Sequence, residues 1–146
     1  MGENMKIAYT DASYDDKKGV AGWGVVIQDG LKERSYSNWL PCDNVNYAEM
    51  FAIYVAGILL GGKGVIYTDS QTAISYIKKE IREDKPRTHK QYIAHQMMRV
   101  LAYKINKFDL EVVKVKGHSK VIEKKAINNN LADLHARKGL AKYYER

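Results

Sequence analysis

Hydrophobic residues in the first third of the chain fall into short runs that polar or glycine-containing segments separate. The runs at 6–10, 22–27 and 31–39 have the length and the β-branched and aromatic content of strands. Asp29-Gly30 lies between the second and third runs and is typical of a hairpin turn. The polar segment 14–19 is interpreted as a turn. The pattern therefore predicts that the chain begins with a β-sheet.

The remaining two-thirds alternate between helical and strand-like patterns. Apolar residues between 47 and 60 occupy nearly all faces at helical spacing, which predicts a central, buried helix that Gly61-Gly62 ends. The other predicted elements are, in order, a strand at 65–68, a helix at 70–79 capped by Ser70, a helix around 93–101, a strand at 110–115 and a last helix through 141 that the asparagines at 128–130 cap. Three strands, helix, strand, helix, helix, strand, helix is the order of an α/β protein with a mixed sheet.

Length and composition fit one soluble globular domain. The chain has 146 residues, 45% of them hydrophobic and 28% charged, so 1–146 is predicted to be a single domain. No stretch approaches the roughly 18 apolar residues of a membrane span. The start lacks the apolar run of a signal peptide, so a cytoplasmic location without membrane attachment is expected. Cys42 is the only cysteine, which excludes an internal disulfide.

The charge balance favours a polyanionic partner. The formal net charge is +7 at pH 7. A basic protein attracts polyanions, among which nucleic acid is the commonest. Charge alone is equally compatible with a solvated basic surface.

Four acidic residues stand where apolar segments begin or end. Asp11 is predicted just past the first strand, and Glu49 in the first turn of the buried helix. Asp69 follows the fourth strand, and Asp133 is predicted near the start of the last helix. Taken singly, each acid is adequately explained as a turn, cap or helix-dipole residue. Together they predict a site for Mg²⁺, which prefers oxygen ligands, and two such ions about 3.5–4 Å apart support phosphoryl transfer.

Six short motifs give the chain a resemblance to the type 1 ribonuclease H family from about residue 6 to residue 140. They occur in the family's order and close to its spacings. The motifs are Tyr-Thr-Asp-Ala-Ser (9–13), Gly-Trp-Gly-Val-Val-Ile (22–27), Asn-Tyr-Ala-Glu (46–49), Val-Ile-Tyr-Thr-Asp-Ser-Gln (65–71), Val-Lys-Gly-His-Ser (115–119) and Asn-Asn-Leu-Ala-Asp (129–133).

The resemblance implies a fold and an activity. The fold is a five-stranded mixed sheet, with the first three strands antiparallel, flanked by helices. The activity is that of an endoribonuclease that hydrolyses the RNA strand of RNA–DNA hybrids, largely independently of sequence. A monomer suffices for this activity and is the expected state. The resemblance further implies two Mg²⁺ ions, with Mn²⁺ able to substitute, and products with 5′-phosphate and 3′-hydroxyl ends.

The resemblance also assigns roles to the four acids as catalytic metal ligands. It implies that Asp11 bridges both ions, and that Glu49 and Asp69 complete one position, with Glu49 near the scissile phosphate. It implies that Asp133 holds the ion that activates water. His118 matches the family's loop histidine, which suggests proton transfer or product release. The basic stretch 120–128 makes the interval between His118 and Asp133 longer than is usual in the family.

Recognition of a hybrid requires contact with the ribose 2′-hydroxyl, which both donates and accepts hydrogen bonds. The residues expected to contact the substrate are Ser13, Tyr14, Asn46, Gln71 and Asn129. Asn44-Val45-Asn46 departs from the more usual Thr-Asn-Asn of the family.

Two basic segments are candidates for electrostatic contact with the substrate. The segment 78–90 stands where some family members carry a basic handle, and it is interpreted either as a reduced handle or as a solvated helix end. A second cluster of lysines surrounds His118 and comprises Lys114, Lys116, Lys120, Lys124 and Lys125. Binding through such groups is expected to weaken with salt.

Other interpretations remain open at this point. A related two-metal nuclease, such as a transposase or resolvase, usually lacks a match to Glu49. A ribonuclease domain of a reverse transcriptase would carry the same motifs. A non-catalytic hybrid-binding module would be expected to lack at least one metal ligand, and all four are present.

Overall fold

The computed structural model describes residues 6–79, 88–115 and 124–146, with only the backbone for 124–127. Its elements are, in order, β1 (Lys6–Asp15), β2 (Val20–Asp29), β3 (Lys32–Pro41), α1 (Val45–Leu59), β4 (Lys63–Thr68), α2 (Gln71–Ile77), α3 (His89–Asn106), β5 (Asp109–Lys114) and α4 (Lys124–Tyr144). The strands form one sheet in the order β3-β2-β1-β4-β5. β1, β2 and β3 pair antiparallel, whereas β4 and β5 join in parallel. The predicted mixed sheet and the predicted order of elements are confirmed.

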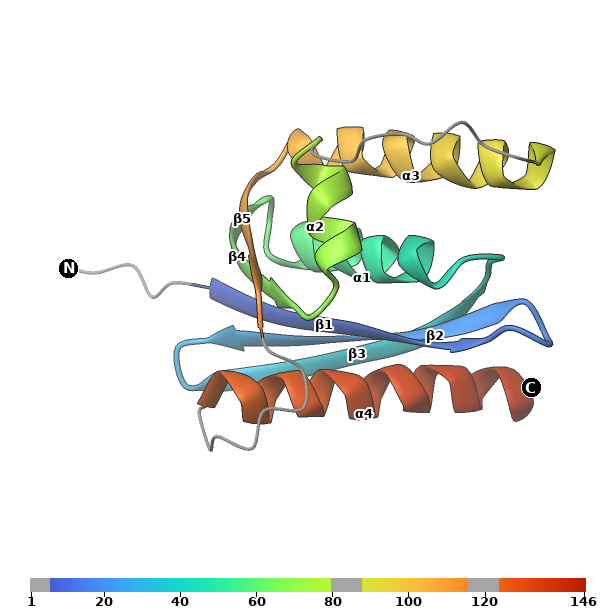
Figure 1. Cartoon of the computed structure of the whole chain (residues 1–146). Coiled ribbons are helices and arrows are strands. Elements are labelled where there is room, and N and C mark those ends of the chain that lie inside the picture. The colour runs from blue at the N-terminus through green and yellow to red at the C-terminus, as the bar shows by residue number, and fades with distance from the viewer. Residues whose placement is uncertain (1–5, 80–87, 116–123) are drawn as a thin grey trace.

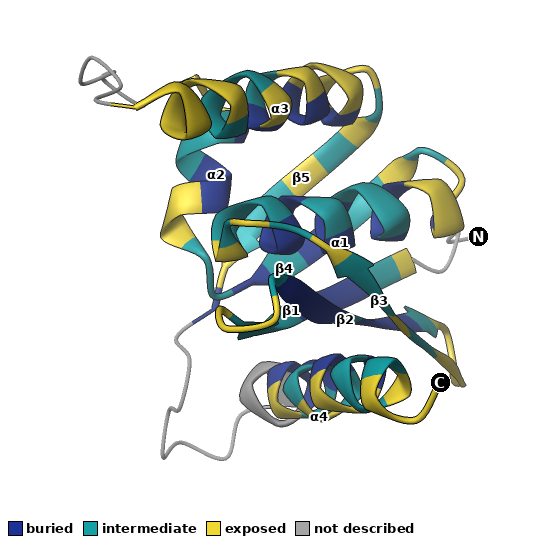
Figure 2. Ribbon diagram, turned by 90° about the vertical axis from the view of Figure 1, so that its right-hand side faces the viewer, coloured by how far each residue is buried: buried dark blue, intermediate teal, exposed yellow. Residues whose placement is uncertain are grey.

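Helices cover both faces of the sheet. α1, α2 and α3 lie on one face and α4 lies alone on the other (Figure 1). α1 lies between the sheet and α3 (Figure 2), which explains why its sequence is apolar on nearly all sides. Met50 and Ile53 of α1 are fully buried in the hydrophobic core between the sheet, α1 and α3. No helix within the described ranges is long and apolar enough to cross a membrane.

Glycines allow α4 to approach the sheet at backbone distance. Gly22 and Gly24 of β2 face the backbone of α4, and Gly139 of α4 faces the backbone of β2 and β3. A Cβ atom at Gly24 would lie 2.5 Å from the carbonyl oxygen of Ala132 and 2.5 Å from the amide nitrogen of Ala136. Both atoms belong to the helix backbone and cannot rotate away. This contact fixes the position of α4, and therefore of every side chain on it, relative to β1 and β2.

Gly24→Ala is expected to lower the free energy of unfolding by about 3 kcal/mol, the upper end of the range for overpacking. Gly61→Ala provides the matched control, because Gly61 has a positive φ but no atom within 4 Å of an added Cβ. That control should cost only ~1 kcal/mol, the strain of a left-handed backbone. Urea unfolding of both variants measures the difference. Equal costs at the two positions would contradict the close approach of α4.

The structure corrects the predicted position of Asp11. Asp11 lies within β1, paired with Gly24, and not past the end of the strand. β1 continues to Asp15, which pairs with Val20, so the predicted turn at 14–19 is too long. The turn is short because the Asp15 carboxylate accepts hydrogen bonds from the backbone N–H groups of Lys17 and Lys18, each at 3.1 Å. Gly19 then supplies a φ of +63° for the return into β2.

Two helices begin earlier than predicted. Asn44 is the N-cap of α1, with its side chain accepting from the N–H of Asn46, so Glu49 lies beyond the first turn. α4 begins at Lys124. The three asparagines at 128–130 therefore do not cap it, and Asp133 lies more than two turns inside the helix. The predicted caps at Ser70 and at Gly61-Gly62 are confirmed, since Ser70 accepts from the N–H of Ala73 and the Gly62 N–H donates to Gly57.

Candidate active site

The site forms where two neighbouring strands separate. The parallel pairing of β1 with β4 ends at Tyr9 and Tyr67, whereas β1 stays paired with β2 as far as Asp15. Asp11 and Asp69 lie just beyond the last β1–β4 pair, one on each side of the opening. Carboxyl ends of strands at such a divergence are the usual location of sites in open α/β sheets.

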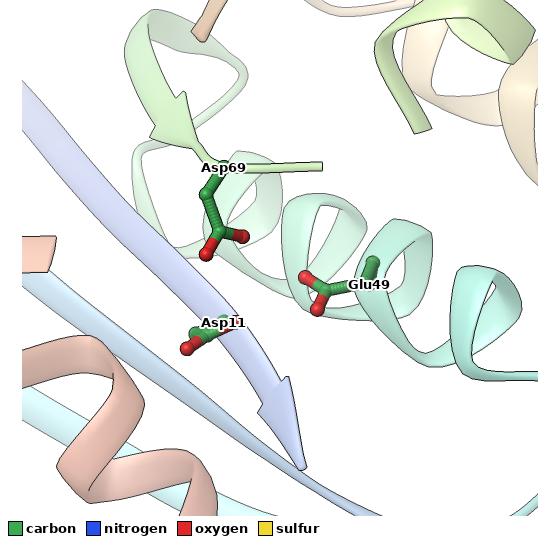
Figure 3. Close-up of side chains that lie close together, drawn as sticks. All are labelled: Asp11, Glu49 and Asp69. Carbon is green, nitrogen blue, oxygen red and sulfur yellow. The ribbon is translucent and has the colours of Figure 1, made fainter. Parts of the chain in front are cut away.

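Glu49 reaches the same opening from α1. Carboxylate oxygens of Asp11, Glu49 and Asp69 all lie within 4.8 Å of one another. In Figure 3 these residues come from β1, α1 and the end of β4, and the Glu49 side chain points from its helix toward the other two. Asp11 and Glu49 are only 7% and 8% exposed. One oxygen of Glu49, Oε2, has no hydrogen-bond partner in the described part of the chain.

Burial and mutual repulsion change the acidity of two of these carboxyl groups. Burial, and next the neighbouring Asp69 carboxylate, raises the pKa of Asp11 from 3.8 to about 7. Burial, followed by the charges of Asp11 and Asp69, raises the pKa of Glu49 well above its usual value. Three carboxylates so close together do not stay ionised at neutral pH without a compensating positive charge.

Asp133 lies beside Asp11 and belongs to α4, the helix on the other face of the sheet from α1 (Figure 1). It reaches the opening from α4, and it raises the pKa of Asp11 further by a side-chain hydrogen bond and by its charge. Its side chain is 38% exposed, so it lies at the rim of the site. The fold therefore brings three of the four predicted acids within 4.8 Å of one another and places the fourth, Asp133, beside Asp11. Their roles as metal ligands stay predictions.

The donor set fits a hard divalent cation. All the converging atoms are carboxylate oxygens, which suit Mg²⁺ or Mn²⁺ and not the softer metals that need nitrogen or sulfur. The unpartnered buried oxygen of Glu49 is the kind of orphaned group that an ion would satisfy. A bound cation would also reduce the electrostatic repulsion among the acids, which favours its binding.

The residues predicted to contact substrate lie on the same elements as the acids or directly after them, and all but one are exposed or partly exposed. Ser13 and Tyr14 continue along β1 beyond Asp11 and are partly exposed. Asn46 lies in the first turn of α1 and is partly exposed, and Gln71 is the exposed first residue of α2. Asn129 is only 3% exposed and its Oδ1 has no partner in the described residues. All five substrate contacts stay predictions.

Several predicted residues lie outside the described part of the chain. They are His118, Lys116, Lys120, the greater part of the segment 78–90, and the side chains of Lys124 and Lys125. Two of the predicted basic residues whose side chains are described line a cleft of about 540 Å³ between α2 and β5 together with Gln71. These two are Lys78 and Lys114. Positive charge therefore lies beside one of the predicted substrate contacts.

One residue at the site was not identified from the sequence. Arg137 forms an ion pair with Asp133, with 2.9 Å between Nη2 and Oδ2. The signal in the sequence is the spacing of four residues between an acid and a base on one helix. That spacing is so common on solvated helix faces that it draws no attention without the structure.

Comparisons with known proteins agree with this fold. A family model for RNase H matches residues 3–141. The RNase H1 of the halophilic archaeon Halobacterium salinarum superposes with a TM-score of 0.65 at 19% identity, covering 94% of this chain and 98% of that one. The N-terminal RNase H domain of a Mycobacterium tuberculosis protein, solved as a fusion with maltose-binding protein, gives a TM-score of 0.64 at 14% identity, covering 96% of each chain.

A viral protease–reverse transcriptase also contains this fold. The protease–reverse transcriptase of prototype foamy virus gives a TM-score of 0.66 at 22% identity, covering 92% of this chain and 20% of that one. At these identities the structural matches show a shared fold. A comparison with curated protein sequences finds no match.

Proposed function

The chain belongs to the RNase H family, as the match of the family model over residues 3–141 shows, and from this premise we propose that it hydrolyses the RNA strand of RNA–DNA hybrids with the aid of two divalent metal ions. The observation that carries the proposal is the convergence of Asp11, Glu49 and Asp69, with Asp133 beside Asp11, at one opening in the sheet. Family membership supports a nuclease in general. The details below are proposed for this chain from its own residues.

The proposed role of each of the four acids follows from its position. Asp11 lies near each of the other three carboxylates, so it would hold both ions. Glu49 and Asp69 would complete one position, and Asp133 would complete the other. When bound, Mg²⁺ ions stabilise the negative charge that develops on the attacking and leaving oxygens. The burial of Asp11 and Glu49 strengthens this effect, because charges interact more strongly where water is excluded.

The other groups around the opening position the substrate. Asn46 and Gln71 are proposed to form hydrogen bonds with ribose 2′-hydroxyls, since an amide both donates and accepts hydrogen bonds. Lys78 and Lys114 are proposed to attract phosphates, which carry no base information, so cleavage should depend little on sequence. We further propose that residues 1–146 act as a single catalytic domain, as a cytoplasmic monomer. The reaction is the same for a free enzyme and for a ribonuclease domain within a longer protein.

Nucleic-acid selectivity tests this proposal. An end-labelled RNA–DNA hybrid, an RNA duplex and a DNA duplex of one sequence are incubated with the protein in Mg²⁺. Only the RNA strand of the hybrid should be cut, and a second hybrid of scrambled sequence should be cut at a similar rate. Ligation and primer extension of the fragments should reveal 5′-phosphate and 3′-hydroxyl ends. Equal cutting of the RNA duplex, cutting of the DNA strand, or 3′-phosphate ends would contradict the proposal.

A further inference from the structure

Asp133 differs from Asp11 and Glu49 in how its side chain is held. Asp11 and Glu49 are buried, so the surrounding protein restricts their rotamers. The Asp133 side chain is 38% exposed at the rim, where packing restricts it less. Its backbone is nevertheless fixed, because glycines bring α4 against the sheet at the adjacent residue, Ala132. What remains to be fixed is the orientation of the Asp133 carboxylate.

Arg137 supplies that restraint. It lies one turn further along α4, and its guanidinium contacts Oδ2 of Asp133 at 2.9 Å. The same carboxyl group interacts with Asp11 across the opening. A carboxylate has two oxygens, so it can bind a metal ion through one oxygen while the other accepts from a guanidinium. Such outer partners of metal ligands commonly set the orientation of the ligand.

We infer that Arg137 is a positioning residue that orients Asp133 toward the metal position shared with Asp11. The inference rests on the proposed function, because it assumes that the acids bind divalent ions. Arg137 itself contacts no metal and no reacting atom. Its own side chain is 64% exposed, so the ion pair is not explained by a need to neutralise a buried charge.

Loss of Arg137 would change metal affinity in two opposite ways, through the charge that is removed and through the orientation that Asp133 loses. Removing a cation from the neighbourhood of a metal site reduces repulsion, which by itself strengthens metal binding. Removing an outer partner that orients a ligand typically weakens metal binding by about 10–100-fold. Weaker binding after the loss of Arg137 can therefore arise from lost orientation but not from lost charge.

Mn²⁺ binding without substrate tests the inference. Free Mn²⁺ is measured by electron paramagnetic resonance during titration of the natural protein and of Arg137→Ala, Arg137→Lys and Lys138→Ala. Arg137→Ala should weaken the binding of the second Mn²⁺ about tenfold, and Arg137→Lys should restore part of the loss. Lys138 is an exposed cation on the next position of α4, so Lys138→Ala should leave binding unchanged or slightly tighter. In an Asp133→Asn background, Arg137→Ala should have no further effect.

The outcomes separate the inference from the proposed function. If the natural protein binds two Mn²⁺ ions and Arg137→Ala binds them equally or more tightly, the inference is overturned and the proposed function stands. If the folded natural protein binds no Mn²⁺, the proposed function fails and the inference fails with it. A circular dichroism spectrum and an unfolding curve for each variant show that the altered binding is not a consequence of misfolding.

Discussion

Asp11→Asn is expected to lower the rate of hybrid cleavage by about a thousandfold or more, which corresponds to ~4 kcal/mol of lost transition-state stabilisation. Asp11 is the acid that lies near all three others, so its charge contributes to every proposed metal position. Asparagine has nearly the same shape but cannot carry the negative charge that a divalent ion requires. Cleavage of an end-labelled hybrid under single-turnover conditions measures the effect.

The matched control for this substitution is Asp29→Asn. This variant makes the same Asp-to-Asn change at an exposed residue, which lies at the end of β2 and outside the site. Its replacement should leave the cleavage rate within about twofold, because isolated surface substitutions have small effects. Fluorescence anisotropy should show that Asp11→Asn still binds the hybrid in EDTA. An Asp11→Asn protein that cleaves at the natural rate would disprove the metal-ligand assignment.

In the absence of divalent metal, the free energy of unfolding is expected to fall by about 4 kcal/mol between pH 4 and pH 7. The pKa of Asp11 is raised from 3.8 to about 7 in the folded protein. Between these values the folded state binds more protons than the unfolded state, so stability decreases as pH rises. Each pKa unit corresponds to about 1.4 kcal/mol, which gives the expected magnitude. The raised pKa of Glu49 acts in the same direction.

Urea unfolding in EDTA at several pH values measures this dependence. Asp11→Asn should flatten the curve and should be more stable than the natural protein at pH 7, because it removes the buried charge. Excess Mg²⁺ should restore the stability of the natural protein at pH 7 and should have little effect on the variant. Stability that rises from pH 4 to pH 7 in EDTA would show that the carboxylates do not repel one another as the structure indicates.

The order of elements could be predicted because hydrophobic periodicity and caps are local properties of the sequence. Ser70 and Gly61-Gly62 were identified correctly, since each satisfies helix-end groups within a few residues. The predicted extent of β1 was too short, because the strand continues through the polar residues after Thr10. Its continuation depends on pairing with β2 and on the turn before Gly19, which local hydrophobicity does not reveal.

The sequence could predict which acids lie at the site, but it could not predict how they are arranged. The resemblance of six motifs to a known family identified Asp11, Glu49, Asp69 and Asp133 together. Their arrangement depends on where β1 and β4 diverge and on how closely α4 packs, and both are tertiary properties. Arg137 was missed for a related reason. Its spacing from Asp133 acquires meaning only when the structure places Asp133 beside Asp11.

Metal-dependent cleavage of an end-labelled RNA–DNA hybrid by the natural protein is the decisive test of the proposed activity. We expect the RNA strand to be cut in Mg²⁺, the cutting to stop in EDTA, and the cutting to resume when Mg²⁺ is returned in excess. Cutting that continues in EDTA would contradict the carboxylate site. A folded protein that binds the hybrid but cuts nothing in Mg²⁺ or Mn²⁺ would instead be a hybrid-binding module, and the proposed activity would be wrong.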